Sequence, residues 1–411
     1  MIETKLNVGY LVTHKKNECF GCEACIDVCS HRAITMKEDD EGFRYPEIDT
    51  EKCVNCGLCQ RTCPAQSLPE KNPANPLVFG GHIKDQNILN KSTSGGIFSA
   101  LAETWCKDGN YVIFGAYADR LEIHHTYITD IKEIGKFRKS KYNQSHVNNS
   151  YQEAKKFLKD GKRVLFSGTP CQIAGLKKVL GRLFESENLL TIEVVCEGFP
   201  SPIFLRKYVG KLEKKYSDKV ISLDYRFKND KKWDFQCMDI GFKSGRHHVK
   251  DRWFLPFWVF WARRLMSRPS CETCPLRTPE RIADITLGDL WGVQKYCPEL
   301  YNDNKGATLT VCNSDKGKLW FIKTKEILDG HELEFNDALK FQRPMRVIVP
   351  ASSDRNKFME DLKILDYDTL CKKWNGKEPL KILFKKYVWG SNSQVVARFK
   401  LNQKIKNLFS K

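Results

Sequence analysis

Short apolar runs alternate with helical patterns along the middle of the chain. Three runs rich in β-branched and aromatic residues predict strands at residues 111–116 (YVIFGA), 163–168 (RVLFSG) and 189–196 (LLTIEVVC). Because strands that are separated by helices form parallel β-α-β units, we expect an open α/β sheet, mixed or mostly parallel, flanked by helices. Residues 225–242 predict a β-hairpin region.

Two stretches lack this pattern and divide the chain. Residues 64–76 (PAQSLPEKNPANP) hold four prolines among polar residues, which is typical of an exposed linker, so we place a domain boundary there. From residue 376 onward nine Lys and Arg stand against one acidic residue, and Leu401, Ile405 and Leu408 recur at helical spacing. We expect a basic, helical tail over residues 376–411, which is either a solvated helix or a docking element for an acidic partner or a membrane surface.

The composition argues against several classes of protein. No window of about 18 uninterrupted apolar residues is present, which argues against a membrane span. Residues 1–10 lack the features of an export signal, so we expect a cytoplasmic protein, with peripheral membrane attachment through the tail as the alternative. The formal net charge of +18 favours acidic partners such as nucleic acid, anionic lipid or an acidic redox protein, without choosing among them.

Eight of the 17 cysteines form two compact clusters with one spacing. The run C-x2-C-x2-C-x3-C occurs twice, as in bacterial two-cluster ferredoxins, in which the fourth cysteine of each run ligates the other cluster. We therefore predict an α+β bacterial-ferredoxin-like domain over residues 1–68 with two [4Fe-4S] clusters. One is held by Cys19, Cys22, Cys25 and Cys63, and the other by Cys53, Cys56, Cys59 and Cys29. Structural zinc is the alternative, which two matching runs of four cysteines disfavour.

Four later cysteines stand where a further site could form. Cys171 and Cys196 lie at the carboxyl ends of two predicted strands, where open α/β sheets bind ligands, and Cys271 and Cys274 form one C-x2-C pair. Together they could hold a third iron–sulfur cluster or zinc, whereas Cys171 alone could be a nucleophile or a buried thiol. The other cysteines and the histidine pairs have no ligand-like spacing, and we interpret them as core or surface residues: Cys106, Cys237, Cys297, Cys312, Cys371, His124, His125, His247 and His248.

A short run of hydroxyl groups and glycines precedes an apolar helical pattern. It reads Ser92-Thr93-Ser94-Gly95-Gly96, and residues 97–105 follow as the expected helix. Free backbone N–H groups and the positive end of a helix dipole can bind phosphate at such a place. A simple helix cap with a loop is the alternative interpretation.

Six stretches together resemble the coenzyme F-420 hydrogenase/dehydrogenase beta-subunit family, in family order, over about residues 92–292. They read STSGGIFSAL, GKFRKSKYNQS, VLFSGTPCQIAGLKKVL, VVCEGFPSP, RPSCETCPLR and ADITLGDLWG. The resemblance implies a flavoprotein with FAD and a [4Fe-4S] cluster in an α/β domain, which we place at residues 79–375 after a linker at 69–78. It implies that the cluster is held by Cys171, Cys196, Cys271 and Cys274. It also implies that Thr93, Ser94, Gly95 and Gly96 lie along the FAD phosphates, and that Lys141, Tyr142 and Asp289 line the pocket.

The combined pattern predicts an iron–sulfur flavoprotein oxidoreductase. Electrons would pass between the ferredoxin clusters and FAD, in either direction, for two-electron conversion of an organic substrate or a deazaflavin. The expected partners are a redox protein or reduced ferredoxin. One alternative is an accessory electron-transfer subunit whose substrate site lies on another polypeptide. A nucleic-acid-binding protein with structural clusters is supported by the net charge alone, and we do not expect it.

The aromatic residues Trp253, Trp258 and Trp261 predict core packing, with shielding of a flavin or docking of a flat substrate as the alternative.

Overall fold

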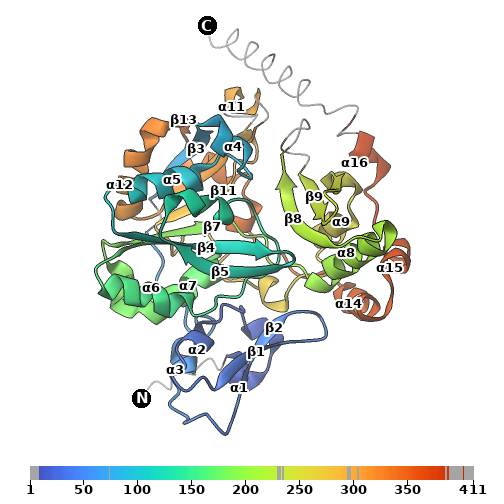
Figure 1. Cartoon of the computed structure of the whole chain (residues 1–411), viewed down its shortest axis with the longest axis horizontal. Coiled ribbons are helices and arrows are strands. Elements are labelled where there is room, and N and C mark those ends of the chain that lie inside the picture. The colour runs from blue at the N-terminus through green and yellow to red at the C-terminus, as the bar shows by residue number, and fades with distance from the viewer. Residues whose placement is uncertain are drawn as a thin grey trace.

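The protein consists of a small N-terminal unit, an eight-stranded sheet with helices on both faces, and a three-stranded sheet with its own helices (Figure 1). The structure is a computed structural model. It describes residues 9–73, 75–228, 236–293, 298–302 and 305–384, together with Trp233, Tyr387 and Leu401. The predicted tail helix therefore lies almost wholly outside the described residues, apart from the short α16 (Leu380–Phe384).

The N-terminal unit has an α+β arrangement. Strands β1 (Ile34–Glu38) and β2 (Arg44–Ile48) pair antiparallel, and in the sequence they lie between two short helices, one within each cysteine run. The helices of the unit are α1 (Tyr10–Thr13), α2 (Ala24–Asp27) and α3 (Leu58–Arg61). The ferredoxin-like domain that the cysteine spacing predicts is confirmed.

The central sheet is mixed, with strand order β13-β3-β12-β11-β7-β6-β4-β5. Its middle strands β11, β7, β6 and β4 are parallel, and the outer pairs are antiparallel. The α/β prediction is confirmed in this form. The strands are β3 (Leu77–Ile83), β4 (Tyr111–Asp119), β5 (Glu122–Ile128), β6 (Arg163–Gly168), β7 (Leu189–Val194), β11 (Ile285–Asp289), β12 (Thr308–Cys312) and β13 (Leu328–Glu332).

Both faces of this sheet are buried, because successive side chains of a strand point to opposite faces. On β4, Val112 and Phe114 pack into one core while Ile113 packs into the other. Helices α5 (Ile97–Cys106) and α12 (Asp315–Thr324) cover the Ile113 face, and α6 (Ser150–Lys159) and α7 (Pro170–Leu180) cover the other. Burial on both faces explains why the parallel strands read as continuous apolar runs.

The three-stranded sheet belongs to a second hydrophobic core. Strands β8 (Val220–Phe227) and β9 (Cys237–Phe242) pair antiparallel, as the sequence predicts for this region, and β10 (His247–Lys250) extends the sheet. The aromatic run 253–261 contributes α9 (Pro256–Ala262), whose side chains lie inside this core. The helices that pack here are α8 (Pro202–Tyr216), α14 (Arg355–Ile364) and α15 (Tyr367–Lys373). The remaining short helices are α4 (Gln86–Asn90), α11 (Glu299–Asn302) and α13 (Phe335–Leu339).

The ferredoxin domain is docked on the rest of the protein through buried polar contacts. The fully buried Arg268 donates to the carbonyl oxygens of Cys19 at 3.1 Å and Arg44 at 3.0 Å, and to the side chain of Gln144 at 3.1 Å. Arg355 forms a bidentate ion pair with Glu41, with N–O distances of 3.1 and 2.6 Å. Because buried charges without partners are costly, these contacts fix the position of the domain.

The chain between the two parts contains no helix or strand over the described residues 64–73 and 75–76. It is nevertheless bound to the main domain through Asn72. The backbone N–H of Asn72 donates to the carbonyl oxygen of Arg281, and its side chain donates to the carbonyl oxygens of Ile282 and Ala283. Strand β3 begins at Leu77, inside the predicted linker at residues 69–78. The domain limits derived from the sequence remain predictions.

Candidate iron–sulfur and cofactor site

The two cysteine runs of the ferredoxin domain share one backbone conformation. In the first run Gly21 and Glu23 have φ angles of 66° and 63°, and in the second run the equivalent Asn55 and Gly57 have φ angles of 55° and 67°. These residues in the left-handed conformation bend the chain on both sides of the second cysteine of each run, so that neighbouring thiols can face one centre. The duplication in the sequence is therefore a duplication of local structure.

The proximal set, nearest to the main domain, contains Cys22. Burial raises the pKa of the Cys22 thiol well above its ordinary value, and the neighbouring thiols that raise it further are those of Cys63, Cys25 and Cys19. These four residues are the set that the spacing predicts for one cluster. Gly21 also donates its backbone N–H to the Cys19 sulfur at 3.4 Å.

The distal set lies closer to the protein surface. Burial raises the pKa of the Cys59 thiol, and the thiols of Cys29 and Cys53 raise it further. Cys56, the remaining predicted member of this set, is exposed. The structure thus places Cys29 of the first run beside the cysteines of the second, as the crossed ligation of two-cluster ferredoxins requires.

The chemistry of both sets fits iron–sulfur clusters. Crowded thiols that raise one another's pKa become thiolates when a positively charged metal centre is bound between them. Among the described residues, no three His, Cys, Asp or Glu side chains are close enough to hold one metal ion. The assignment of individual cysteines to clusters remains a prediction.

A third set of thiols gathers in the main domain. Burial is the first cause of a raised pKa at each of its four members, and each also lies within the electrostatic reach of at least one other member. The pKa of Cys196 is raised to about 11 by burial and by Cys271, and that of Cys271 to about 11 by burial and by Cys274. The set consists of Cys171, Cys196, Cys271 and Cys274, and its role as a metal site stays a prediction.

The backbone around the third set allows a close approach. Gly198 has φ of 96°, donates its N–H to the Cys196 sulfur at 3.3 Å, and would place a Cβ 2.9 Å from the Cβ of Cys271. Thr169, which caps α7, has its hydroxyl 3.2 Å from the Cys171 sulfur. Hydrogen bonds to sulfur favour the thiolate, so these groups suit a metal-binding set.

The third set lies beside the proximal set. Cys22 is among the groups that raise the pKa of the Cys171 thiol, after burial and Cys196. A Cβ on Gly175 of α7 would lie 3.4 Å from the Cys22 sulfur. The start of α7 therefore carries one thiol of the third set, and its next turn contacts the ferredoxin domain.

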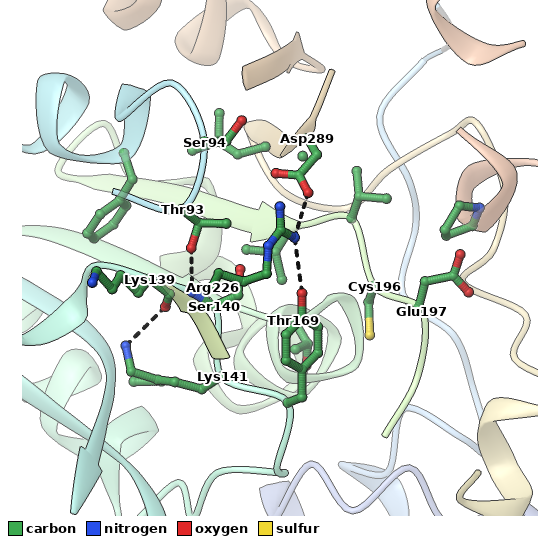
Figure 2. Close-up of a pocket in the computed structure, with 18 of the residues that line it drawn as sticks. Thr93, Ser94, Lys139, Ser140, Lys141, Thr169, Cys196, Glu197, Arg226 and Asp289 are labelled. Atoms are coloured by element: carbon green, nitrogen blue, oxygen red, sulfur yellow. Dashed lines mark hydrogen bonds and ion pairs between the residues drawn. The ribbon is translucent and has the colours of Figure 1, made fainter. Parts of the chain in front are cut away.

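A cavity of about 560 Å³ opens at the carboxyl ends of the parallel strands, as expected for an open α/β sheet. Six of the seven predicted cofactor residues line it, namely Thr93, Ser94, Gly96, Lys141, Tyr142 and Asp289. Cys196 and Thr169 line it as well, so the cavity borders the third set (Figure 2). Its lining contains seven Lys and Arg against two acidic residues, Glu197 and Asp289, which favours an anionic ligand.

Gly95 differs from its neighbours in the predicted phosphate-binding run. It does not line the cavity, and its N–H donates to the Thr308 hydroxyl at 2.8 Å. A Cβ at Gly95 would lie 2.3 Å from the carbonyl oxygen of Gly81, so glycine is needed here for close packing against β3. Ser94 likewise turns its hydroxyl to the carbonyl oxygen of Ala307 at 2.5 Å.

The rest of this run faces the cavity. Gly96, with φ of 77°, caps α5, and Ile97 and Phe98 in the first turn of that helix line the cavity. Thr93 accepts a hydrogen bond from the backbone N–H of Ser140 at 2.8 Å, which joins the two predicted cofactor-binding loops (Figure 2). The N-terminus of α5 is therefore placed as in helices that bind phosphate.

Lys141 organises the second loop. Its ammonium donates to the carbonyl oxygens of Phe137, Arg138 and Lys139 at 3.4, 2.8 and 3.2 Å. Burial lowers the pKa of Lys141 to about 7, and Asp224 opposes the shift. With its three protons donated to the backbone, Lys141 shapes the loop that lines the cavity.

Tyr142 lies in an aromatic wall. Its ring centroid is 5.0 Å from those of Trp258 and Trp261, both of which line the cavity. Its hydroxyl accepts a hydrogen bond from Arg226 at 3.3 Å, and the same guanidinium nitrogen donates to Asp289 at 2.8 Å. Figure 2 shows Arg226 extending toward Asp289.

Several cavity residues were not identified from the sequence, and Arg226 and His125 are two of them. Arg226 stands alone in a predicted hairpin with no motif around it, so the sequence carries no signal for it. His125, which we interpreted as incidental, is buried in the cavity wall, with Nδ1 2.9 Å from the Ser145 hydroxyl and Nε2 3.1 Å from the Ser167 carbonyl oxygen. Because the carbonyl only accepts, Nε2 carries the proton, and burial lowers the pKa of His125 to about 4.

The fold and the site define an iron–sulfur protein of the oxidoreductase type, in which a ferredoxin domain adjoins an α/β domain with a ligand cavity. Two family models agree with this description. Residues 18–67 match the 4Fe-4S dicluster domain, and residues 161–337 match the C terminus of the beta subunit of coenzyme F420 hydrogenase/dehydrogenase. Residues 161–337 thus belong to the coenzyme F420 hydrogenase/dehydrogenase beta-subunit family, which confirms the resemblance found in the sequence.

Curated proteins match shorter parts of the chain. NADH-quinone oxidoreductase subunit I 2 of Geobacter metallireducens is 39% identical over 62 residues, which cover 14% of this chain and 47% of that protein. Archaeal-type glutamate synthase [NADPH] of Thermotoga sp. is 25% identical over 133 residues, which cover 32% of this chain and 24% of that protein. The chain therefore spans less than half the length of these relatives.

Among solved structures, a chain of the F420-reducing [NiFe] hydrogenase complex from Methanosarcina barkeri is similar, with a TM-score of 0.44 and 15% identity. The similarity covers 74% of this chain and 95% of that one. Within the part of the chain that the structure describes, no helix is both long enough and apolar enough to cross a membrane.

Proposed function

We propose that this protein passes electrons between an external redox partner and a bound FAD, by way of two ferredoxin clusters and a third [4Fe-4S] cluster. The FAD would exchange two electrons with an organic substrate or a deazaflavin. The observation that carries the proposal is the continuity of the thiol sets. Cys22 of the proximal set neighbours Cys171 of the third set, and Cys196 of the third set lines the cavity.

The order of the thiol sets supports a path between the protein surface and the cavity. The distal set includes the exposed Cys56, with the exposed side chains of Val54 and Leu58 beside it in the sequence. This face could contact a redox protein or reduced ferredoxin, since an apolar rim around an exposed redox centre is a suitable docking surface. The order of the centres from this face is then distal set, proximal set, third set and cavity.

The cavity suits FAD in three respects. Its lining is cationic, the N-terminus of α5 faces it, and the aromatic residues Tyr142, Trp258 and Trp261 can exclude water from one wall. Thr93, Gly96 and the first turn of α5 would lie along the phosphates, and Lys141 would hold the neighbouring loop. When bound, a flavin accepts single electrons and delivers them as a pair.

The experiment compares wild-type protein with Cys171→Ser, both purified without oxygen. We expect bound FAD in both, but reduction of the flavin through the ferredoxin domain only in the wild type, because the variant lacks a ligand of the third cluster. Cys106→Ser is the matched control, since Cys106 is a half-buried thiol outside all three sets. Flavin reduction at the wild-type rate in Cys171→Ser would exclude the relay.

The same preparation separates the alternatives. Protein that contains flavin and clusters but shows no turnover with any organic acceptor, when fed by dithionite, would be an accessory electron-transfer subunit. Protein without flavin would favour structural clusters and a binding function. If Cys171→Ser abolished turnover while its flavin still received electrons, Cys171 would be a nucleophile instead.

A further inference from the structure

Two arginines in the cavity have more hydrogen-bond donors than the described residues satisfy. Arg226 is 5% exposed and uses Nη1 for both Asp289 and Tyr142. Its Nη2 is buried and has no hydrogen-bond partner among the residues that the structure describes. A buried donor without an acceptor costs free energy, and a guanidinium cannot avoid that cost by losing its proton.

Arg252, which follows β10, presents the same imbalance. Its Nη1 donates to the side chain of Gln236 at 3.0 Å, while its Nε is buried and lacks a partner within the described ranges. The side chain is held over aromatic rings, 5.1 Å from the centroid of Trp253 and 5.6 Å from that of Trp258. It therefore stays in the cavity wall, and no carboxylate of the described residues contacts it.

The carboxylates of the cavity do not neutralise both arginines. Asp289 is paired with Arg226, and Glu197 is paired with Arg264. Arg226 is close enough to Arg252 to disfavour its charge. Glu378 and Glu197 favour that charge from a distance, but neither forms an ion pair with Arg252 in the part of the chain that the structure describes. A buried Arg226 and a half-buried Arg252, with one carboxylate in contact with Arg226, are stabilised by a further anion.

We propose that Arg226 and Arg252 bind a phosphate or carboxylate group of an organic ligand in the cavity. The ligand also has a planar part, since the wall beside the arginines consists of Tyr142, Trp258 and Trp261. Guanidinium groups suit this role because they bind both kinds of anion through two parallel hydrogen bonds. The anion belongs either to the pyrophosphate of FAD or to the substrate.

This inference rests on the proposed function in one respect: only the assignment of the anion to FAD or to the substrate depends on the flavin site. The first measurement is therefore made on full-length, cluster-containing protein freed of flavin, by calorimetric titration with inorganic pyrophosphate. We expect Arg226→Gln and Arg252→Gln each to weaken binding by about tenfold or more, because each removes a charge-assisted contact. Arg182→Gln is the control, since Arg182 is exposed and lies outside the cavity.

Arg226→Gln leaves Asp289 without its cation, so that variant could fail to fold. The double variant Arg226→Gln/Asp289→Asn removes the buried ion pair as a unit and is expected to lose pyrophosphate binding in the same way. Arg252→Gln disturbs no ion pair within the described ranges and provides an independent measurement. Unchanged pyrophosphate affinity in both Arg252→Gln and the double variant, or no binding by the wild type, would overturn the proposal.

Titration of FAD-saturated protein then separates the two sources. If FAD abolishes pyrophosphate binding and the arginine variants also bind FAD about tenfold more weakly, the anion is the pyrophosphate of FAD. If pyrophosphate still binds beside FAD and FAD affinity is unchanged in the variants, the anion belongs to the substrate. Failure of the protein to bind FAD would contradict the proposed function, while the pyrophosphate titration would still test the arginine site.

Discussion

The hydroxyl of Tyr151, on α6, donates a hydrogen bond to the backbone carbonyl oxygen of Cys22 at 2.9 Å. Tyr151 is completely buried, and the thiols of both Cys22 and Cys171 help to raise its pKa. One phenol thus lies between the proximal set and the third set, and it fixes the ferredoxin domain at the point where the two sets meet.

Tyr151→Phe tests this link. The variant leaves the Cys22 carbonyl oxygen without its donor, so we expect the free energy of unfolding to fall by about 1 kcal/mol. Tyr208→Phe is the matched control, because Tyr208 is also buried and its hydroxyl lies 3.0 Å from His248, outside all three thiol sets. Denaturant unfolding should show a similar loss for both variants, whereas only Tyr151→Phe should slow flavin reduction through the ferredoxin domain.

The metal content provides the second prediction. Three four-iron clusters require about twelve iron and twelve sulfide per chain. Cys274→Ser, prepared without oxygen, should lower both by about four while the electron paramagnetic resonance signals of the ferredoxin clusters remain. Metal and sulfide analysis of the wild type and the variant is the measurement. About eight iron together with one zinc in the wild type would show that the third set holds zinc.

Gly95→Ala should destabilise the protein through packing alone. The added Cβ would meet the Gly81 carbonyl oxygen at 2.3 Å and the Thr308 backbone nitrogen at 2.8 Å, and such overpacking costs about 1–3 kcal/mol. Gly210→Ala on α8 is the control, because no atom from another part of the chain lies within 4 Å of where its Cβ would be, and alanine favours a helix. A Gly95→Ala protein as stable as the wild type in denaturant unfolding would contradict this account.

His125 should make stability depend on pH. Its pKa is lowered to about 4 in the folded protein from 6.5, so the unfolded chain takes up a proton first as the pH falls. The stabilisation is fully present above pH 6.5 and should decline by about 3 kcal/mol toward pH 4. In His125→Gln the unfolding free energy should fall less steeply over this window. Identical pH profiles for His125→Gln and the wild type would contradict the prediction.

The basic tail can be tested without disturbing the described contacts. Removal of residues 388–411 retains Tyr387, whose hydroxyl donates to Asp251 at 2.6 Å, and deletes five basic residues. If the tail docks on membranes, the truncated protein should bind phosphatidylserine vesicles more weakly, by about 1 kcal/mol per basic residue at the surface. The binding that is lost should also be sensitive to salt. Equal vesicle sedimentation of both proteins would favour a solvated tail.

Local sequence patterns predicted the parallel strands β4, β6 and β7, but not β11 or the antiparallel edges. The run at residues 163–168 coincides with β6, because a strand buried on both faces must be apolar throughout. Strand β3 (LVFGGHI) pairs with β12 and β13, far away in the chain, and its two glycines weaken the strand pattern. Such long-range pairing leaves no local signal.

The candidate site also contains residues that the sequence predicts and residues that only the structure reveals. Cysteine spacing predicted the proximal and distal sets because metal ligation constrains residue type and distance along the chain, whereas the third set was predicted from strand ends, a C-x2-C pair and the family resemblance. Arg226 and His125 lie in the cavity wall because of tertiary packing, and a single arginine or histidine in a strand has no neighbours that mark its role. The hydroxyl and glycine run was recognised as a unit, yet only the structure separates Gly96, which faces the cavity, from Gly95, which packs against β3.

The burial of Arg268 has a kinetic consequence. Its guanidinium cannot leave the carbonyl oxygens of Cys19 and Arg44 without losing acceptors that water would have to replace, so the ferredoxin domain does not act as a swinging carrier. Any electron that crosses between the two parts travels a gap of constant width. The rate of that internal step should therefore be first order, independent of protein concentration and solvent viscosity, and only exchange with an outside partner should depend on diffusional encounter.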